Sequence, residues 1–238
     1  MKSLILAAGL GSRIPEISQQ KPKCLILINR KTILKRQIDI MKKKNISDIG
    51  IITGYKRNKI KFSNIKYFYN KNFKNNEQLE SLMVAKNFLN DDIIITFSDI
   101  IYDENILEYL IKSKNNFSIA VDRNWKRRYK NRIDHPYSQA DKVLIKKNKV
   151  LKIGKDLPMN FVNGEFLGMI KISKSFCRVF CDYYEKIRKK SLKMQLHNFI
   201  QYLIHNKIKV SPCYVNGKFM EIDTFNDLQI AKKQFYEK

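Results

Sequence analysis

The sequence predicts an α/β fold of three layers, in which helices cover both faces of a mixed, mostly parallel central sheet. Short runs of β-branched and apolar residues alternate along the chain with longer amphipathic segments, which is the pattern of strands and helices that take turns. In the first half this alternation favours helical crossovers between parallel strands. No Gly/Ser-rich or Pro-rich linker divides the chain, which favours one domain over residues 1–238.

The first half of the chain, residues 1–122, contains five apolar runs that are predicted strands. They are Ser3–Ala8, Asp48–Thr53, Ile65–Phe68, Asp92–Phe97 and Ser118–Asp122. The amphipathic segments between them are predicted helices, at Thr32–Lys44, Glu77–Asn90 and Asp103–Lys114. Asp103 is expected to cap the third of these helices, because Asp is a favoured residue at helix starts.

The second half begins with an inserted β-rich segment, predicted around residues 123–170, that is expected to supply the walls of a second pocket. The strands predicted from this point on are Lys142–Ile145, Val150–Ile153, Glu165–Ile172, Val210–Val215 and Lys218–Ile222. The predicted helices are Lys174–Lys189, Leu196–His205 and Thr224–Tyr236. Thr224 with Asp227 three residues later resembles a weak capping box at the start of the last helix.

The charge of the chain is strongly positive. Its 238 residues include 47 Lys and Arg against 22 Asp and Glu, which gives a formal net charge of +25. Such a charge is also found in nucleic-acid-binding proteins. Here the basic residues do not gather on one predicted helix, so a diffuse lysine background is the favoured interpretation. The hydrophobic content of 44% is near the globular average and argues against disorder.

Neither a membrane span nor a structural metal site is predicted. The longest apolar stretches are Leu4 to Leu10 and Ile93 to Thr96, well short of the roughly 20 residues that a membrane helix needs. The first of them is also too short for the core of a signal peptide. The four cysteines, Cys24, Cys177, Cys181 and Cys213, form no C-x-x-C pair and have no histidines at zinc spacing. A reduced, cytoplasmic protein is therefore expected.

The first predicted strand ends in a loop suited to bind an anion. It reads Leu6-Ala7-Ala8-Gly9-Leu10-Gly11-Ser12-Arg13, and small residues with glycine let the backbone N–H groups approach a phosphate closely. The loop is neither a Walker A motif nor a complete dinucleotide fingerprint, because Pro15 lies just past the place of the third glycine. Lys21-Pro22-Lys23 returns cations toward the same loop. The alternative interpretation is a tight turn followed by a solvated basic loop.

This loop resembles the signature of the nucleotidyltransferases, which activate small phosphorylated metabolites with a nucleoside triphosphate. Two acidic motifs extend the resemblance: Phe97-Ser98-Asp99 after a buried strand, and Glu221-Ile222-Asp223-Thr224 before the last helix. The second motif resembles the phosphocholine and phosphonate cytidylyltransferases. Further matches to that branch are Glu80-Ser81-Leu82, Val121-Asp122 with Trp125, Tyr129 with Arg132, Ile153-Gly154-Lys155 and Gly164-Glu165-Phe166. The resemblance implies a Rossmann-like fold.

The resemblance also implies four catalytic residues. In nucleotidyl transfer an oxygen of the acceptor attacks the α-phosphorus of the nucleotide and expels pyrophosphate, so cations must bring two anions together. Arg13 and Lys23 are the expected protein cations. Asp99 and Asp223 are expected to hold Mg²⁺ through carboxylate oxygens. An aspartate at a strand end is also a common turn or cap residue, and this alternative applies to both.

Nucleotide binding is assigned to the first loop together with a serine on the second predicted helix. The residues are Leu6, Ala7, Ala8, Gly9, Gly11, Ser12, Arg13, Lys23, Ser81 and Asp99. The resemblance implies that the loop and the Glu77–Ser81 region recognise a pyrimidine. CTP is the expected nucleotide, and the sequence leaves UTP open. Ser81 is alternatively an ordinary residue of a helix surface.

The acceptor pocket is assigned to residues of the second half. They are Asp122, Trp125, Arg132, Lys155, Glu165, Asn198 and Glu221. Carboxylates with an aromatic face would suit a cationic head group, as in phosphocholine enzymes. Trp125 is alternatively a cover for the inserted segment. Asn198 lies at a position where relatives commonly have an aspartate, which favours an acceptor with a weaker or displaced cation.

A cluster of four arginines suggests a further anionic group on the acceptor. It comprises Arg123, Arg127, Arg128 and Arg132, and a solvated loop is the alternative.

The function expected from the sequence is thus a Mg²⁺-dependent cytidylyltransferase that acts on phosphocholine, an aminoethylphosphonate or a phosphoramidate, for the modification of surface polysaccharide or lipid. Residues 1–122 would bind CTP and residues 123–238 the acceptor. The alternatives are a sugar-1-phosphate nucleotidyltransferase that uses UTP and, more distantly, a nucleic-acid-binding protein. The oligomeric state stays open.

Overall fold

The computed structural model describes residues 1–11, 14 and 19–236. Its main sheet is built from β1 (Lys2–Ala7), β4 (Asp48–Thr53), β5 (Lys66–Tyr69), β6 (Ile93–Phe97), β8 (Phe117–Asp122), β9 (Lys142–Lys146), β10 (Lys149–Gly154), β11 (Gly164–Ile172) and β12 (Ser211–Tyr214). The strand order is β10-β9-β11-β6-β1-β4-β5, with β8 on β11 and β12 on β8. Strands β6, β1, β4 and β5 run parallel, and β11 is antiparallel to β6.

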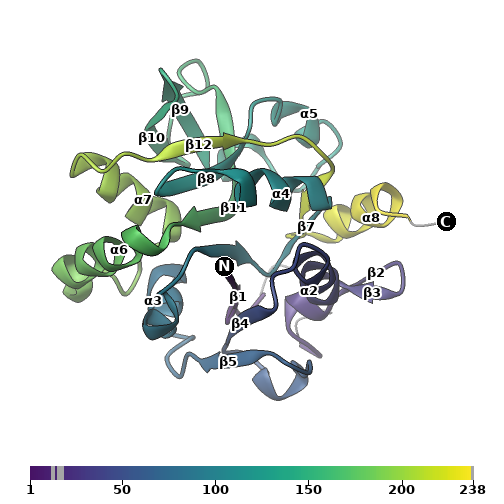
Figure 1. Ribbon diagram of the computed structural model, residues 1–238. Coiled ribbons are helices and arrows are strands. Elements are labelled where there is room, and N and C mark those ends of the chain that lie inside the picture. Colours follow the sequence, from purple (N-terminus) through teal and green to yellow (C-terminus); the bar gives the residue numbers. More distant parts are fainter. Residues whose placement is uncertain (12–13, 15–18, 237–238) are drawn as a thin grey trace.

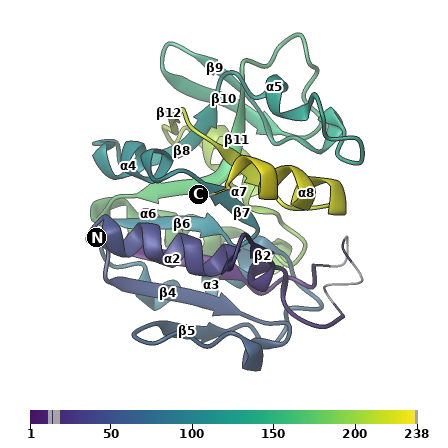
Figure 2. The ribbon, with the colours of Figure 1, turned by 90° about the vertical axis from the view of Figure 1, so that its right-hand side faces the viewer.

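Helices cover both faces of this sheet because the strands bury both of their faces. Leu4 and Leu6 pack in one core, with residues of α3 (Gln78–Met83), α6 (Lys174–Ile187) and α7 (Leu196–His205). Ile5 and Ala7 point the other way, as alternation along a strand requires, toward α2 (Ile33–Lys43) and α4 (Glu104–Lys112). Figure 1 shows α3, α6 and α7 on one side of the sheet, and Figure 2 faces the side covered by α2, α4 and α8 (Phe225–Gln234). The predicted three-layer fold is confirmed.

The inserted segment extends the main sheet at the β11 edge through β9 and β10, whose apolar residues pack in the same core as α7. It carries the β9–β10 hairpin and the short helix α5 (Lys126–Tyr129), which project together at the top of Figure 2. Trp125, Tyr129 and Ala140 form a small core of their own under this segment. No helix in the described part of the chain is both long and apolar enough to span a bilayer.

One long-range strand pair, missed from the sequence, joins the two acidic motifs. The strand β7 (Ile100–Tyr102) pairs antiparallel with β13 (Phe219–Glu221), and Glu221 lies opposite Ile100. A three-residue strand directly after Asp99 gives no periodicity signal of its own. The pairing places both motifs at the carboxyl end of β6, where open α/β sheets bind ligands. The small hairpin of β2 (Leu27–Ile28) and β3 (Lys31–Thr32) was missed for the same reason.

The predicted helix over Glu77–Asn90 is too long. The helix α3 ends at Met83, and a 3-10 turn follows over Lys86–Phe88. This turn brings the ring of Phe88 to 5.3 Å from that of Phe68. Both rings lie above Gly50, where an added Cβ would meet the Phe88 ring at 3.0 Å. The packing of Phe68 and Phe88 on the backbone of Gly50 therefore favours the end of the helix, although the sequence pattern would continue it.

The two predicted helix starts have different outcomes. Thr224 and Asp227 form a complete capping box at the start of α8, as expected. Asp103 stands at the N-cap position of α4, but its side chain makes no capping bond. Its carboxylate instead accepts the backbone N–H of Lys218 at 2.8 Å, which ties the start of α4 to the segment before β13.

Candidate functional site

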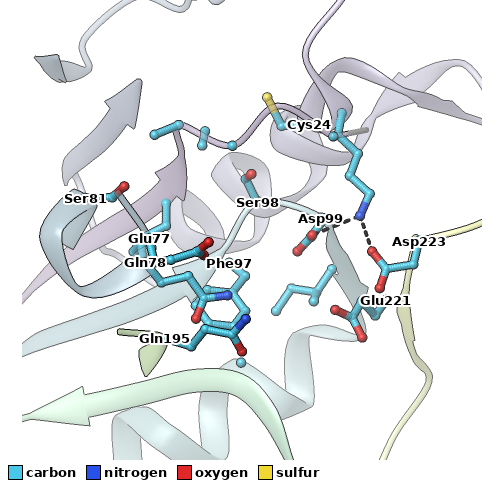
Figure 3. Close-up of a pocket in the computed structure, with 18 of the residues that line it drawn as sticks. Cys24, Glu77, Gln78, Ser81, Phe97, Ser98, Asp99, Gln195, Glu221 and Asp223 are labelled. Carbon is cyan, nitrogen blue, oxygen red and sulfur yellow. Dashed lines mark hydrogen bonds and ion pairs between the residues drawn. The ribbon is translucent and has the colours of Figure 1, made fainter. Parts of the chain in front are cut away.

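A cavity of about 440 Å³ lies where β1 and β6 end. One of its walls consists of the loop after β1 and the start of α3, to which the sequence analysis assigned nucleotide binding. Its other walls come from β11, β13 and the ends of β9 and β10. Figure 3 shows side chains from the start of α3, the end of β6 and the segment of Glu221 and Asp223 around one space. Almost all of the described site residues predicted from the sequence line it; the exceptions are given below.

Lys23 connects the two acidic motifs inside the cavity. It begins the short 3-10 helix Lys23–Leu25, and its Nζ lies 3.1 Å from Oδ2 of Asp99. The same Nζ forms a second ion pair with Oδ1 of Asp223, as Figure 3 shows. Burial by itself would lower the pKa of Lys23, but the negative charges of Asp99, Asp223 and Glu221 outweigh it and raise that pKa above its usual value. The lysine is therefore held as a cation.

The oxygens of Asp99 and Asp223 form a donor set that fits a hard divalent cation. Each carboxylate directs one oxygen at the Lys23 ammonium, so the two converge on a single point of positive charge. Oδ1 of Asp99 is buried and has no hydrogen-bond partner among the described residues. A carboxylate oxygen without a donor inside a protein is costly unless a ligand meets it. Mg²⁺ prefers such oxygen ligands.

His135 is a site residue that the sequence analysis missed. It is 2% exposed, and its Nδ1 lies 2.7 Å from a terminal nitrogen of Arg132. Its Nε2 lies 3.9 Å from Oε2 of Glu221. Ligand atoms of His135, Glu221 and Asp223 all lie within 4.8 Å of one another. No local pattern marks His135, because only tertiary packing brings the inserted segment against the second acidic motif.

Glu221 occupies an environment that disfavours its charge. Burial is the largest cause, and the neighbouring carboxylates of Asp223 and Asp99 add repulsion, so the pKa of Glu221 lies well above its usual range. Lys23 and Arg132 oppose this shift. Because its side chain is still 33% exposed toward the cavity, Glu221 offers a polar group to a ligand.

Arg132 lines the cavity but is already held by protein partners. Its Nε donates to Oδ1 of Asp227 at 2.6 Å, and a terminal nitrogen donates to the carbonyl oxygen of Glu221 at 3.1 Å. Oδ2 of Asp227 accepts the backbone N–H groups of Asp223 and Thr224. Arg132 thus braces the segment that carries Asp223.

The described residues that were predicted to bind the nucleotide line one side of the cavity. Leu6 to Gly11 line it together with Ser81. The loop lies against Gly54, where an added Cβ would come within 2.6 Å of the carbonyl oxygen of Ala8. Ser81 accepts a hydrogen bond from Nδ2 of Asn70 at 2.8 Å. Ser12 and Arg13, both predicted for this side, lie outside the described residues.

The acceptor side differs from the predicted cation-binding box. Arg128 forms ion pairs with both Asp122 and Glu165, and the Tyr129 hydroxyl donates to Glu165. Two carboxylates that were assigned to a cationic head group therefore share one arginine within the protein, which offsets one of their two negative charges. Glu165 still lines the cavity, whereas Asp122 is buried beside it.

Two predicted acceptor residues, Trp125 and Asn198, lie outside the cavity. Trp125 is 1% exposed, and its ring packs edge-on against Tyr129 at 5.5 Å, so it belongs to the core of the inserted segment. Asn198 lies on the exposed side of α7, and the charge argument that was based on it does not apply to this cavity. The residue of this region that does line the cavity is Gln195, just before α7. Figure 3 shows it beside Gln78.

Several lining residues escaped the sequence analysis because they are polar residues common in loops. They include Gln139, Asp141 and Gln195. Only the fold gathers them with Gln78, since Gln78 and Gln195 come from the starts of different helices. The Gln78 side chain accepts the backbone N–H of Leu196 at 2.9 Å, which joins these two helix starts.

Comparison with known proteins identifies relatives over the whole chain. The family described as the MobA-like NTP transferase domain matches residues 3–169. CTP:phosphoglutamine cytidylyltransferase of Campylobacter jejuni is 26% identical over 97% of this chain and 98% of its own length. Choline-phosphate cytidylyltransferase of Streptococcus pneumoniae is 31% identical over 48% of this chain and 51% of its own.

Solved structures share the fold at low sequence identity. The inositol-1-phosphate CTP transferase of T. maritima superposes with a TM-score of 0.77 at 17% identity, over 100% of this chain and 98% of its own. The CTP:phosphocholine cytidylyltransferase of Streptococcus pneumoniae gives a TM-score of 0.74 at 19% identity, over 98% of this chain and 97% of its own. At these identities the likeness establishes the fold.

Proposed function

The chain belongs to the nucleotidyltransferase family with a MobA-like NTP transferase domain, and from this premise we propose that it is a magnesium-dependent cytidylyltransferase. It would transfer CMP from CTP to a small phosphorylated or phosphonate acceptor and release pyrophosphate. Two relatives whose names state such a reaction, the phosphoglutamine and choline-phosphate enzymes, support the choice of CTP and of a phosphorylated acceptor.

The observation that carries the proposal is the placement of Lys23 between Asp99 and Asp223. The acceptor phosphate needs no general base, because its second pKa is about 6 and it is largely anionic at neutral pH. The task of the protein is to hold two anions in line and to stabilise added negative charge. Lys23, a buried cation beside the loop after β1, is suited to meet the phosphates of the nucleotide.

Mg²⁺ would be held by Asp99 and Asp223, whose oxygens already converge in the cavity. When bound, the metal would neutralise charge on the triphosphate. The role of Lys23 would be to donate to a phosphate oxygen of the nucleotide from its place in the cavity wall. Glu221 lines the cavity beside this point and would restrict the orientation of the acceptor, while the buried His135 packs behind it.

The acceptor is proposed to be phosphocholine, an aminoethylphosphonate or a phosphoramidate such as phosphoglutamine. Its product would be an activated head group for surface polysaccharide or lipid, made in the cytoplasm. A sugar-1-phosphate reaction with UTP is the runner-up, and it has no specific support in the cavity. Arg128 is paired with two of the carboxylates expected to bind a bare cation and offsets half of their charge, so the nature of the head group needs a direct test.

Pyrophosphate release tests the proposal. The purified chain is incubated with CTP, UTP, ATP or GTP and with each acceptor, including glucose 1-phosphate, in the presence of Mg²⁺ or of EDTA. The expected result is release with CTP and one acceptor class, lost in EDTA. Release only with UTP and a sugar phosphate would replace the proposal by the runner-up. If no combination of nucleotide and acceptor releases pyrophosphate, the proposed cytidylyltransferase activity is contradicted.

A further inference from the structure

Two residues of opposite charge lie side by side where the β9–β10 hairpin opens into the cavity. Asp141 directly precedes β9 and Lys155 directly follows β10. The last paired residues of the hairpin are Lys142 and Gly154, so Asp141 and Lys155 come one step beyond that pair on neighbouring strands. Both residues line the cavity.

Neither residue forms an ion pair with a lysine, arginine, aspartate or glutamate among the described residues. Within residues 1–11, 14 and 19–236, no carboxylate lies within the 4.0 Å ion-pair distance of Lys155, and no Lys or Arg lies within it of Asp141. They do not pair with each other either. In this respect they differ from Glu165 on the same wall, which is paired with Arg128.

Asp141 is held in place by its surroundings. Its Oδ1 lies 3.0 Å from Nδ1 of His197, a buried residue in the first turn of α7. Its carbonyl oxygen accepts the backbone N–H of Phe166 at 2.8 Å. The backbone of Asp141 is thus fixed, while its Oδ1 is buried with no hydrogen-bond partner among the described residues and its side chain stays 18% exposed in the wall of the cavity. A carboxylate beside an unpaired ammonium is complementary to a ligand that carries both charges.

We propose that Asp141 and Lys155 form a subsite for a zwitterionic head group, so that the acceptor is the phosphorylated derivative of an α-amino acid. Asp141 would accept hydrogen bonds from the ammonium, and Lys155 would donate to the carboxylate. The inference rests on the proposed cytidylyl transfer. A choline-type acceptor has no carboxylate and would leave Lys155 facing a cation, and a neutral sugar would leave both charges unpaired in a partly desolvated wall, which disfavours each of them.

Matched acceptors separate the two charges in one experiment. Phosphoserine carries both, phosphoethanolamine lacks the carboxylate, and 3-phosphooxypropanoate lacks the ammonium; phosphoglutamine and its two corresponding analogues provide a longer series. Specificity is measured as kcat/KM for pyrophosphate release from CTP. The acceptor with both charges is expected to exceed each truncated analogue of its series by roughly 10- to 100-fold.

The variants Lys155→Met and Asp141→Asn assign the charges to residues. Lys155→Met is expected to lower kcat/KM roughly 10- to 100-fold for acceptors with a carboxylate and to leave the analogue without one within about twofold. Asp141→Asn should do the same for acceptors with an ammonium. Lys152→Met, an exposed lysine on β10, is the matched control and should change neither.

The outcomes distinguish the two proposals. If the chain releases pyrophosphate from CTP but prefers an acceptor without a carboxylate, or if Lys155→Met lowers all acceptors equally, the zwitterion subsite is wrong and the cytidylyltransferase stands. If no acceptor supports release, the cytidylyltransferase itself is contradicted and the subsite falls with it. Unchanged thermal unfolding of both variants shows that a loss of specificity is not a loss of fold.

Discussion

The backbone N–H of Ile222 donates to the carbonyl oxygen of Asp99 at 2.9 Å. This bond extends the β7–β13 ladder and fixes the spacing of the two acidic motifs, which lie far apart in the sequence. Asp99 and Asp223 thereby come to lie on either side of the Lys23 ammonium. The geometry of the candidate site thus depends on a short antiparallel strand pair rather than on a loop.

The substitutions Asp99→Asn and Asp223→Asn should each reduce turnover by at least about 100-fold, because each removes one anionic oxygen donor from the proposed metal site. Titration with Mn²⁺, followed by electron paramagnetic resonance, should show weaker metal binding in both variants. Asp182→Asn, on an exposed ion pair, is the control. Normal turnover in either variant would remove that aspartate from the metal site.

Lys23→Met should lower kcat by roughly 100- to 1,000-fold and change the KM for CTP much less, since the ammonium is expected to act mainly on charge that develops in the transition state. The variant also leaves two carboxylates without their ammonium, so Mg²⁺ should raise its melting temperature more than that of the wild type. Lys21→Met in the same loop serves as the comparison. An effect confined to KM would contradict the proposed role.

Arg132→Met should reduce the free energy of unfolding by about 3–5 kcal/mol, because it leaves Asp227 buried without its guanidinium partner. Asp227 is fully buried and its pKa is held below the usual range: burial opposes this shift, but the hydrogen bonds from His135 and Arg132 outweigh it. Urea unfolding measures the change. Arg178→Met, which breaks an ion pair at a 92% exposed side chain, should have almost no effect, and an equally small effect for Arg132→Met would refute the bracing role.

Trp125→Phe should lower stability without changing acceptor specificity. The indole is 1% exposed among Tyr129, Tyr137 and Ala140, and a smaller ring leaves a void in that small core. A loss of about 1–3 kcal/mol in unfolding free energy is expected. The ratio of kcat/KM between phosphocholine and phosphoserine should stay within about twofold. A change in that ratio would indicate that Trp125 does contribute to acceptor binding.

Much of the fold could be read from periodicity, and the errors have local causes. The segment of α7, Leu196–His205, was predicted to the residue because its apolar stripe is continuous. The helix over Glu77–Asn90 was overextended because the fit of Phe88 above Gly50 has no counterpart in the helical pattern. The strand β7 was missed because three residues cannot show a period, and its partner is distant in sequence.

The residues of the candidate site likewise fall into those that the sequence could indicate and those that only the structure shows. Motif residues such as Lys23, Asp99 and Asp223 could be selected because their spacing to a glycine loop or a strand end carries chemical meaning. His135, Asp141 and Gln195 could not, because they lie in loops or at helix starts and acquire meaning only from their neighbours. Trp125 and Asn198 were misplaced because residue type indicates what a side chain could bind and not which way it faces.

By itself the sequence determined the α/β class, the nucleotidyltransferase family and the residues around which a phosphate and a metal could be bound, because these depend on local patterns and short motifs. The tertiary structure decided how the charges are distributed. It paired both Asp122 and Glu165 with the single Arg128, and it left Asp141 and Lys155 without an ion pair to the described Lys, Arg, Asp and Glu residues. Electrostatic interactions fall off with distance and depend on burial, so which charges remain for a ligand is settled only when the chain is folded.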